Sequence, residues 1–285
     1  MADETNFDLL VIGGGPGGYV AAIRAAQLKM KVALVEREHL GGICLNWGCI
    51  PTKALLRAAE LRHSIDEMKD FGITVSGEVS IDLKAVVKRS RNVAGRLSTG
   101  VAHLLKKNKV TVFDDRAVLG KAVSGRREVK LAGGGVLSAK HVILATGARA
   151  HALPGIEADG SSILTYREAM VPETMPKSLV IIGSGAIGSE FASFYLDMGV
   201  EVTLIEAMDR ILPVEDAEIS DFVKKAFTKR GMKIITGGRL AGINTGKTGV
   251  TARFEGEIAP VSADRAILAV GITGNTEELG LEGTK

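Results

Sequence analysis

Apolar runs and helical stretches alternate along this chain, and one combination of them occurs twice. The first copy has an apolar run from Leu9 to Ile12, a glycine-rich turn, a helical pattern from Gly17 to about Lys29, and an apolar run from Lys31 to Val35. Short apolar runs on both sides of a helical pattern predict two parallel strands joined by a crossover helix. We therefore expect an α/β fold.

The turn of this first copy has the spacing G-x-G-x-x-G at Gly13, Gly15 and Gly18, and Glu36 ends the second strand. The first glycine permits a tight turn, the second lets a pyrophosphate approach the backbone, and the third lets helix and strand pack closely. The helix N-terminus offers N–H groups and a positive dipole end to a phosphate. Because Glu36 can also accept hydrogen bonds from ribose hydroxyls, the pattern predicts a dinucleotide site.

The same pattern returns at Gly183, Gly185, Gly188 and Glu206, each 170 positions after its counterpart. A single copy is weak evidence, because glycine turns after strands are common. Two copies with equal spacing favour two nucleotide sites, and glycine turns that bind nothing are the alternative. A carboxylate at Glu206 suits a free 2′-hydroxyl and repels a 2′-phosphate, which favours NAD over NADP. Arg210 is the nearby residue that qualifies this preference.

Between the copies, the pattern predicts two helices and a small sheet. One helical stretch follows Lys53 and stops at Phe71 and Gly72, and another runs from Ile81 to about Asn108. The apolar face expected for the second helix consists of Leu83, Val86, Val87, Val93, Leu97, Val101, Leu104 and Leu105. Its expected solvated side, with a basic docking surface as the alternative, consists of Lys84, Lys88, Arg89, Arg91 and Arg96. From Val110 onward we expect an antiparallel excursion that returns to a buried strand at residues 142–145.

Prolines mark the passage into the second copy. Pro154, Pro172 and Pro176 lie between the strand that ends in Thr146 and Gly147 and the second glycine turn, and such clusters are typical of connections. The prediction is two Rossmann-like three-layer nucleotide-binding domains, with the helical and antiparallel insertion in the first. Their expected bounds are 1–150 and 151–272, with a last strand at Ala263 to Ile272 and a return segment at 273–285.

Composition adds little to this picture. The 285 residues are 46% apolar and 24% charged, which suits a globular protein of two domains. A net charge of +3 gives no reason to expect nucleic acid as a partner. The acidic start MADETNFD has no basic n-region, and no apolar run reaches the about 20 residues of a membrane span. We therefore expect a cytoplasmic or mitochondrial-matrix protein with no membrane partner.

Both cysteines, Cys44 and Cys49, lie in the stretch GGICLNWGCIPTK. In a reducing compartment, so close a pair indicates redox chemistry or metal binding. Zinc is disfavoured because the five histidines, at positions 39, 63, 103, 141 and 151, show no ligand spacing. Inert buried thiols are the other alternative.

A disulfide between these cysteines requires a distorted backbone. Residues five positions apart in a regular α-helix have Cα atoms about 8.7 Å apart, and a disulfide tolerates about 7 Å. We therefore expect residues 46–48 to break the helix and a new helix to begin near Cys49, with Pro51 in its first turn. A helix N-terminus would stabilise the Cys49 thiolate and make the disulfide reducible.

The stretch GGICLNWGCIPTK, with the first glycine fingerprint before it and ILATG and GSGAIGSE after it, closely resembles the flavin disulfide reductases, specifically the dihydrolipoyl dehydrogenases. The resemblance covers the whole chain and implies FAD on the first unit and NAD on the second. It implies that Cys49 is the thiolate against the flavin ring and that Cys44 exchanges with a dithiol substrate. Lys53 and Glu190 match the ion pair near the flavin N5, where a cation stabilises reduced flavin. Electrons would pass from dihydrolipoyl thiols to the disulfide, to FAD and then to NAD⁺.

Motifs and resemblance together predict the site residues. The catalytic residues expected are Cys44, Cys49, Lys53 and Glu190. The cofactor-binding residues expected are Gly13, Gly15, Pro16, Gly18, Glu36, Gly42, Lys53, Ala145, Thr146, Gly147, Gly183, Gly185, Gly188, Glu206 and Gly271. No metal is expected.

The resemblance also implies partners, namely the dihydrolipoyl group of an acyltransferase or carrier protein and a second copy of the complete protein in a homodimer. Glu206 disfavours glutathione reductase, whereas mercuric reductase stays open because its extra cysteines would lie beyond residue 285. Members of the family are longer, and the further part carries a second FAD contact, the dimer interface and a His-Glu acid/base pair. For this chain, a catalytically incompetent nucleotide-binding fragment or a diaphorase is therefore the alternative.

Overall fold

The computed structural model describes residues 5–284, so the first four residues of the acidic start and Lys285 lie outside the description. The chain divides into two compact units. The first comprises the residues up to Ile50, Arg91–Arg149 and the residues from Gly274, and the second comprises Pro51–Ser90 and Ala150–Thr273. Residues 51–90, expected in the first domain, thus group with the second unit. No helix in the described part of the chain is long and apolar enough to cross a membrane.

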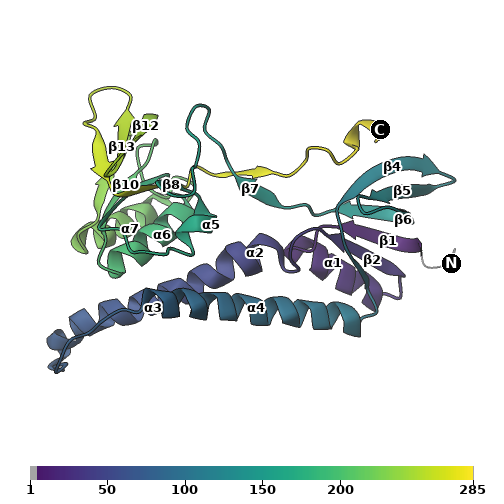
Figure 1. Ribbon diagram of the computed structural model, residues 1–285, viewed down its shortest axis with the longest axis horizontal. Helices are drawn as coiled ribbons and strands as arrows, with labels where there is room; N and C mark the ends of the chain where they lie inside the picture. Colours follow the sequence, from purple (N-terminus) through teal and green to yellow (C-terminus); the bar gives the residue numbers. More distant parts are fainter. Residues whose placement is uncertain (1–4, 285) are drawn as a thin grey trace. The chain divides into compact units, whose positions relative to one another are not determined.

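The first unit is built on a six-stranded sheet with the order β3-β2-β1-β6-β5-β4 (Figure 1). The parallel strands are β1 (Asn6–Ile12), β2 (Val32–Glu36), β3 (Thr111–Asp114) and β6 (Val136–Leu144). The antiparallel strands are β4 (Ala117–Val123) and β5 (Arg126–Leu131). Helix α1 (Pro16–Gln27) connects β1 to β2. These elements confirm the predicted βαβ unit and the antiparallel excursion.

Apolar side chains cover β1 on both faces. Leu9 packs on one face in a cluster with Leu105 of α4 (Leu83–Lys107), and Leu10 packs on the other face with Leu137 of β6. A strand buried on both faces has to be a continuous apolar run, which is why β1 was recognisable in the sequence.

Two predicted apolar surfaces are only partly buried. On α4, Val101 and Leu105 are buried, but Leu97 and Leu104 are each 44% exposed, because they lie on the flank of the stripe that faces the sheet. At the end of β6, Ile143 and Leu144 are 38% and 39% exposed. Helix α1 packs mainly on β1 and β2, so the predicted full burial of this strand end is wrong.

The second unit is built on a five-stranded parallel sheet with the order β11-β10-β9-β15-β8. Its strands are β8 (Ile163–Leu164), β9 (Ser178–Ile182), β10 (Glu201–Ile205), β11 (Lys233–Ile235) and β15 (Arg265–Leu268). Helices α6 (Ala186–Asp197) and α7 (Ala217–Lys229) lie on the opposite face of this sheet from β12 (Leu240–Gly246) and β13 (Gly249–Phe254) (Figure 1). With β14 (Val261–Ala263), the last two strands form a three-stranded antiparallel sheet. The α/β class with three layers is confirmed.

The connections of the second unit differ from the prediction in two places. The proline-marked passage contains strand β8 and a short helix, α5 (Tyr166–Ala169), which Thr165 caps. The strand expected from Ala263 to Ile272 is shorter, because Ala263 ends β14 and β15 stops at Leu268; Gly271, with a φ of 113°, lies in the connection that follows. The chain then forms β16 (Ile272–Gly274), which pairs with β7 (Ala148–Ala150).

The remaining helices lie in the cysteine stretch, in the segment after it and near the end of the described chain. They are α2 (Gly42–Trp47), α3 (Cys49–Glu67) and the 3₁₀ turns η1 (Met68–Phe71) and η2 (Leu281–Gly283). Gly72 ends η1 with a φ of 74°, as expected from the glycine at that position.

Candidate nucleotide and thiol site

The two glycine turns are built in the same way. Gly13 has a φ of 105°, and a Cβ added there would lie 2.1 Å from the carbonyl oxygen of Ala145. Its counterpart Gly183 has a φ of 98° and a backbone carbonyl at 2.4 Å. A Cβ at Gly18 or Gly188 would lie 1.8 or 1.9 Å from the carbonyl oxygen of the first glycine of its turn. Close packing therefore requires glycine at the first and third positions of each turn.

The middle glycine of each turn has space in front of it. A Cβ at Gly185 would meet no atom within 4 Å, and one at Gly15 would meet only the Cα of Gly42, at 3.8 Å. Both glycines are N-caps of twelve-residue helices, and neither helix has a side-chain cap. An open backbone at a helix N-terminus is what a pyrophosphate requires. The residues present therefore fit a dinucleotide in each unit.

A glutamate at the end of the second strand holds each turn. Oε2 of Glu36 accepts a hydrogen bond of 2.6 Å from the backbone N–H of Gly14. Oε2 of Glu206 accepts one of 2.9 Å from the backbone N–H of Ser184. Each carboxylate has further lone pairs, so both can still accept hydrogen bonds from ribose hydroxyls.

The segment that carries the cysteines lies against the first glycine turn. The backbone N–H of Gly41 donates to the carbonyl of Gly14 at 2.8 Å, and a Cβ at Gly42 would lie 2.7 Å from the Cα of Gly15. Cys44 is half-buried and packs on the apolar cluster beneath α1. The cysteine stretch and the predicted flavin turn therefore form one local structure.

The helix is broken between the two cysteines, but only at Gly48, because Asn46 and Trp47, which were also expected to break it, lie in α2. Helix α2 ends at Gly48, which has φ −149° and ψ −120°, and α3 begins at Cys49. A Cβ at Gly48 would lie 3.3 Å from the Cα of Cys44, so the small residue allows a close approach. Cys49 is exposed, and both cysteines are thiols in this structure. Their oxidised form stays a prediction.

The expected ion pair between α3 and α6 is present. Nζ of Lys53 contacts Oε1 of Glu190, and both side chains are partly exposed. The role of this pair beside a flavin stays a prediction.

Of the arginines on α4 predicted as solvated, Arg89 is exposed as expected, whereas the prediction is wrong for Arg91, which is half-buried. Arg89 donates to the carbonyl of Ala54 at 3.0 Å. The guanidinium carbon of Arg91 lies 4.2 Å from the centre of the Trp47 ring, and the same group donates to the carbonyl of Asn46. Burial lowers the pKa of Arg91. A charged residue in a helical pattern does not reveal in the sequence which carbonyl its long side chain reaches.

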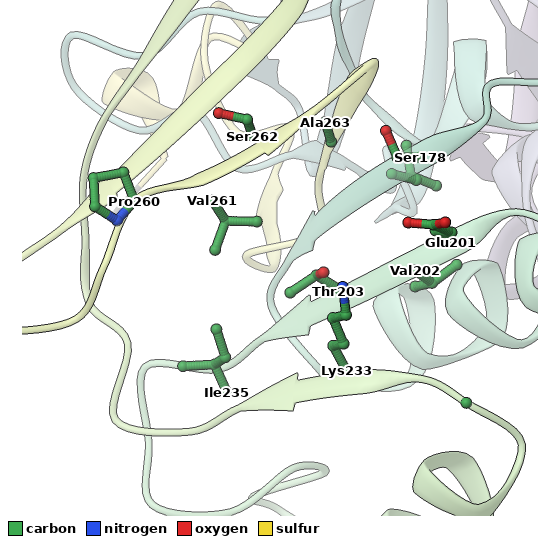
Figure 2. Close-up of a pocket in the computed structure, with 12 residues that line it drawn as sticks. Ser178, Glu201, Val202, Thr203, Lys233, Ile235, Pro260, Val261, Ser262 and Ala263 are labelled. Carbon is green, nitrogen blue, oxygen red and sulfur yellow. The ribbon is translucent and has the colours of Figure 1, made fainter.

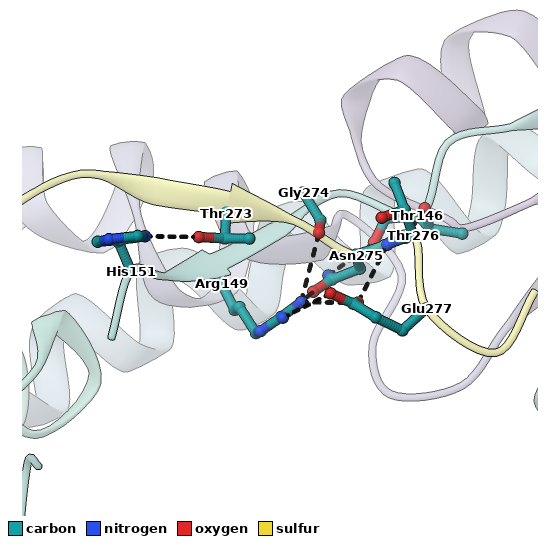
Figure 3. Close-up of polar contacts among 8 residues, drawn as sticks. All are labelled: Thr146, Arg149, His151, Thr273, Gly274, Asn275, Thr276 and Glu277. Atoms are coloured by element: carbon teal, nitrogen blue, oxygen red, sulfur yellow. Dashed lines mark hydrogen bonds and ion pairs between the residues drawn. The ribbon is translucent and has the colours of Figure 1, made fainter. Parts of the chain in front are cut away.

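The strand end at Thr146 and Gly147 is held by residues that the sequence analysis missed (Figure 3). Oγ1 of Thr146 donates to the carbonyl of Asn275 at 2.7 Å, and Nδ2 of Asn275 donates back to the carbonyl of Thr146 at 2.9 Å. Arg149 donates to both carboxylate oxygens of Glu277, at 3.0 and 2.8 Å. These hydrogen bonds lower the pKa of Glu277 to about 2. The partners are more than 120 positions apart, and no local sequence signal marks them.

The model of the family described as "Pyridine nucleotide-disulphide oxidoreductase" matches residues 7–285. The chain belongs to this family.

Several relatives that this chain matches are named dihydrolipoyl dehydrogenase. The protein of Rhizobium etli is 52% identical over 97% of this chain and 61% of its own length. The protein of Acholeplasma laidlawii is 41% identical over 97% of this chain and 82% of its own length. The crystal structure of LpdA from Mycobacterium tuberculosis has a TM-score of 0.88 and 28% identity, over 98% of this chain and 61% of that one. The chain thus spans about three fifths of several relatives that it matches.

The second unit contains a cavity that its own glycine turn does not line. It has a volume of about 510 Å³ in the second unit and is lined by the first residues of β9, β10 and β11, Ser178, Glu201 and Lys233, and by β14 (Figure 2). Open parallel sheets bind ligands outside the carboxyl ends of their strands, and these residues lie at the amino ends. None of the predicted site residues lines this cavity.

Proposed function

We propose that this chain is the flavin- and NAD-binding portion of a dihydrolipoyl dehydrogenase, in which Cys44 and Cys49 form a redox-active disulfide. The observation that carries the proposal is the seating of the cysteine segment on the first glycine turn, through the hydrogen bond from Gly41 to Gly14 and the contact of Gly42 with Gly15. A thiol pair fixed beside a dinucleotide turn is suited to electron transfer with the bound nucleotide.

FAD belongs to the first unit and NAD to the second in this proposal. The turn from Gly13 to Gly18, Glu36, Gly42 and the strand end at residues 145–147 would hold FAD. The second turn, Glu206 and Gly271 would hold NAD, and the Glu206 carboxylate would disfavour a 2′-phosphate. When bound, FAD supplies the chemistry that takes two electrons from the thiol pair and gives a hydride to NAD⁺.

The cysteine pair exchanges electrons with the substrate by thiolate attack. One thiolate of a dihydrolipoyl group attacks Sγ of Cys44, the Cys44–Cys49 bond breaks, and Cys49 leaves as a thiolate. The second substrate thiolate then attacks the mixed disulfide and releases Cys44, so the substrate leaves as a cyclic disulfide. The two electrons stay in the cysteine pair, and the two substrate protons pass to solvent. Cys49 opens a 19-residue helix, whose dipole stabilises the leaving thiolate.

The dithiol would be carried by an acyltransferase or carrier protein, and the complete protein would be a homodimer in the cytoplasm or the mitochondrial matrix. Close relatives named dihydrolipoyl dehydrogenase support a lipoyl-type substrate.

A second candidate function is that of a nucleotide-binding fragment that reduces dyes with NADH but does not oxidise dithiols. This function requires only the two glycine turns, each of which leaves its middle glycine open to a dinucleotide. In the resemblance described above, the His-Glu acid/base pair lies in the part of the family beyond this chain.

Assays of the purified chain distinguish these functions. We expect the chain to be yellow, to bind NADH, and to reduce dyes with NADH. Oxidation of dihydrolipoamide with NAD⁺ supports the first function, dye reduction alone supports the second, and a chain that binds no flavin even when supplied with FAD contradicts both. Reduction of mercuric ion without dithiol oxidation would instead favour a mercuric reductase.

A further inference from the structure

Two side chains of α4 hold the helix that carries Cys44. Arg91 donates to the backbone carbonyl of Asn46, and the hydroxyl of Ser98 donates to the carbonyl of Leu40 and lies 3.2 Å from Oδ1 of Asn46. Arg91 and Ser98 are seven positions apart, which is about two helical turns, so they lie on the same face of α4. This face of α4 is therefore hydrogen-bonded to Leu40, just before α2, and to Asn46 in the last turn of α2.

Asn46 is the centre of this arrangement. Its side chain is buried, and its Nδ2 donates to the carbonyls of Leu40 and Gly42 at 3.0 and 2.9 Å. With Ser98 beside Oδ1, both ends of the buried amide have partners, so the amide has one preferred orientation. The side chain of Asn46, in the last turn of α2, thus holds the backbone at the start of the same helix.

Besides the carbonyl of Asn46, Arg91 contacts the ring of Trp47. The Arg91 guanidinium lies over its ring, with 4.2 Å from the guanidinium carbon to the ring centre. A planar guanidinium stacks on an aromatic ring in a way that a lysine ammonium cannot reproduce. Residues 46 and 47 lie between the two cysteines, so this stack and the Asn46 bond fix the backbone that separates the thiols.

We propose that Arg91 and Ser98 are positioning residues that preorganise the Cys44–Cys49 pair and so favour its disulfide over its dithiol. The redox role of the pair rests on the proposed function. A segment already fixed in the dithiol state loses less conformational entropy when the bond closes. Loss of the Arg91 or the Ser98 side chain therefore lowers the equilibrium constant for disulfide formation.

A purely electrostatic role for Arg91 gives the opposite sign. A cation stabilises thiolates and thereby the reduced pair, so removal of its charge would make the disulfide harder to reduce. Preorganisation predicts a disulfide that is easier to reduce after Arg91→Met and also after Arg91→Lys, which keeps the charge but loses the planar stack. The sign of the change thus decides between the two roles.

The test is a redox titration of this chain in glutathione buffers, with alkylation of thiols and mass analysis of the peptide that contains both cysteines. We expect Arg91→Met, Arg91→Lys and Ser98→Ala each to lower the equilibrium constant for disulfide formation about tenfold, a shift of about 30 mV. Trp47→Phe retains a ring and should stay closer to the parent chain. The matched control is Arg96→Met, because Arg96 is exposed on the same helix and its loss should change nothing.

The outcomes separate this inference from the function on which it rests. If the parent chain forms no Cys44–Cys49 disulfide in any buffer, the proposed function fails. If the disulfide forms, but the Arg91 and Ser98 variants have the same equilibrium constant for disulfide formation as the parent chain, only the positioning role fails. The same holds if their disulfide is harder to reduce. Circular dichroism establishes that each variant is folded, and if Arg91→Met does not fold, the milder Ser98→Ala and Arg91→Lys decide.

Discussion

The carboxylate of Glu206 accepts two hydrogen bonds from Ser184, one from its backbone N–H at 2.9 Å and one from its hydroxyl at 2.6 Å. In the first unit the counterpart of Ser184 is Gly14, which gives Glu36 a single backbone bond. Both Ser184 and Glu206 are buried. The second turn is therefore tied to its glutamate more firmly than the first.

Ser184→Ala is expected to destabilise the second unit. A hydrogen bond to a charged group contributes about 1.5–3 kcal/mol, and the buried carboxylate would lose this partner. Urea unfolding monitored by circular dichroism measures the change. The control is Ser189→Ala, which removes a neutral bond of 2.9 Å to the Ser184 carbonyl and should cost about 1 kcal/mol. An unchanged free energy of unfolding in Ser184→Ala would contradict this reading.

The middle glycine of the second turn is expected to serve binding and not folding. Gly185 has a φ of −64° and open space at its Cβ position, so Gly185→Ala should keep the melting temperature and weaken NADH binding at least about tenfold, or 1.4 kcal/mol. NADH fluorescence titration gives the dissociation constant. Gly188→Ala is the contrast, because its Cβ would overlap the Gly183 carbonyl and the variant should not fold. Tight NADH binding by Gly185→Ala would place the nucleotide elsewhere.

The two glutamates are expected to act on different nucleotides. Glu206→Gln removes the charge that repels a 2′-phosphate, so the preference for NADH over NADPH should fall about tenfold, or 1.4 kcal/mol. Glu36→Gln should leave this preference unchanged and lower the amount of FAD retained in gel filtration. If Glu36→Gln changes the NADH preference, the assignment of nucleotides to units is wrong.

Acid is expected to release the segment after β16 from Arg149. The guanidinium of Arg149 lowers the pKa of Glu277 from 4.5 to about 2. Because the folded pKa is depressed, the stabilisation is present above pH 4.5 and is lost as the pH falls toward 2. Hydrogen exchange of residues 272–284 at decreasing pH should show this release in the parent chain and constant, weaker protection in Glu277→Gln. Glu282→Gln, an exposed position of the same segment, should keep the parent profile, and a parent chain without any acid-dependent release would refute the expectation.

Local patterns in the sequence were enough to predict β1, α1 and β2, because the apolar run and the glycine spacing lie within about thirty consecutive residues. The break at Gly48 was predictable for the same reason, from helix geometry and the spacing of the cysteines. The Arg149–Glu277 pair and the Arg91–Asn46 bond could not be predicted, since each joins residues far apart in sequence through long side chains. The early end of the strand before Gly271 was missed because an apolar run does not show where the backbone leaves the sheet.

The proposed function depends above all on the storage by Cys44 and Cys49 of two electrons taken from a dithiol. Its most direct test is the mass of the peptide that contains both cysteines, alkylated before and after anaerobic treatment of the purified chain with dihydrolipoamide. We expect an unalkylated disulfide peptide before treatment and a doubly alkylated peptide after it. A peptide that is doubly alkylated from the start, even after exposure to a mild oxidant, would show that the two cysteines do not form a redox disulfide.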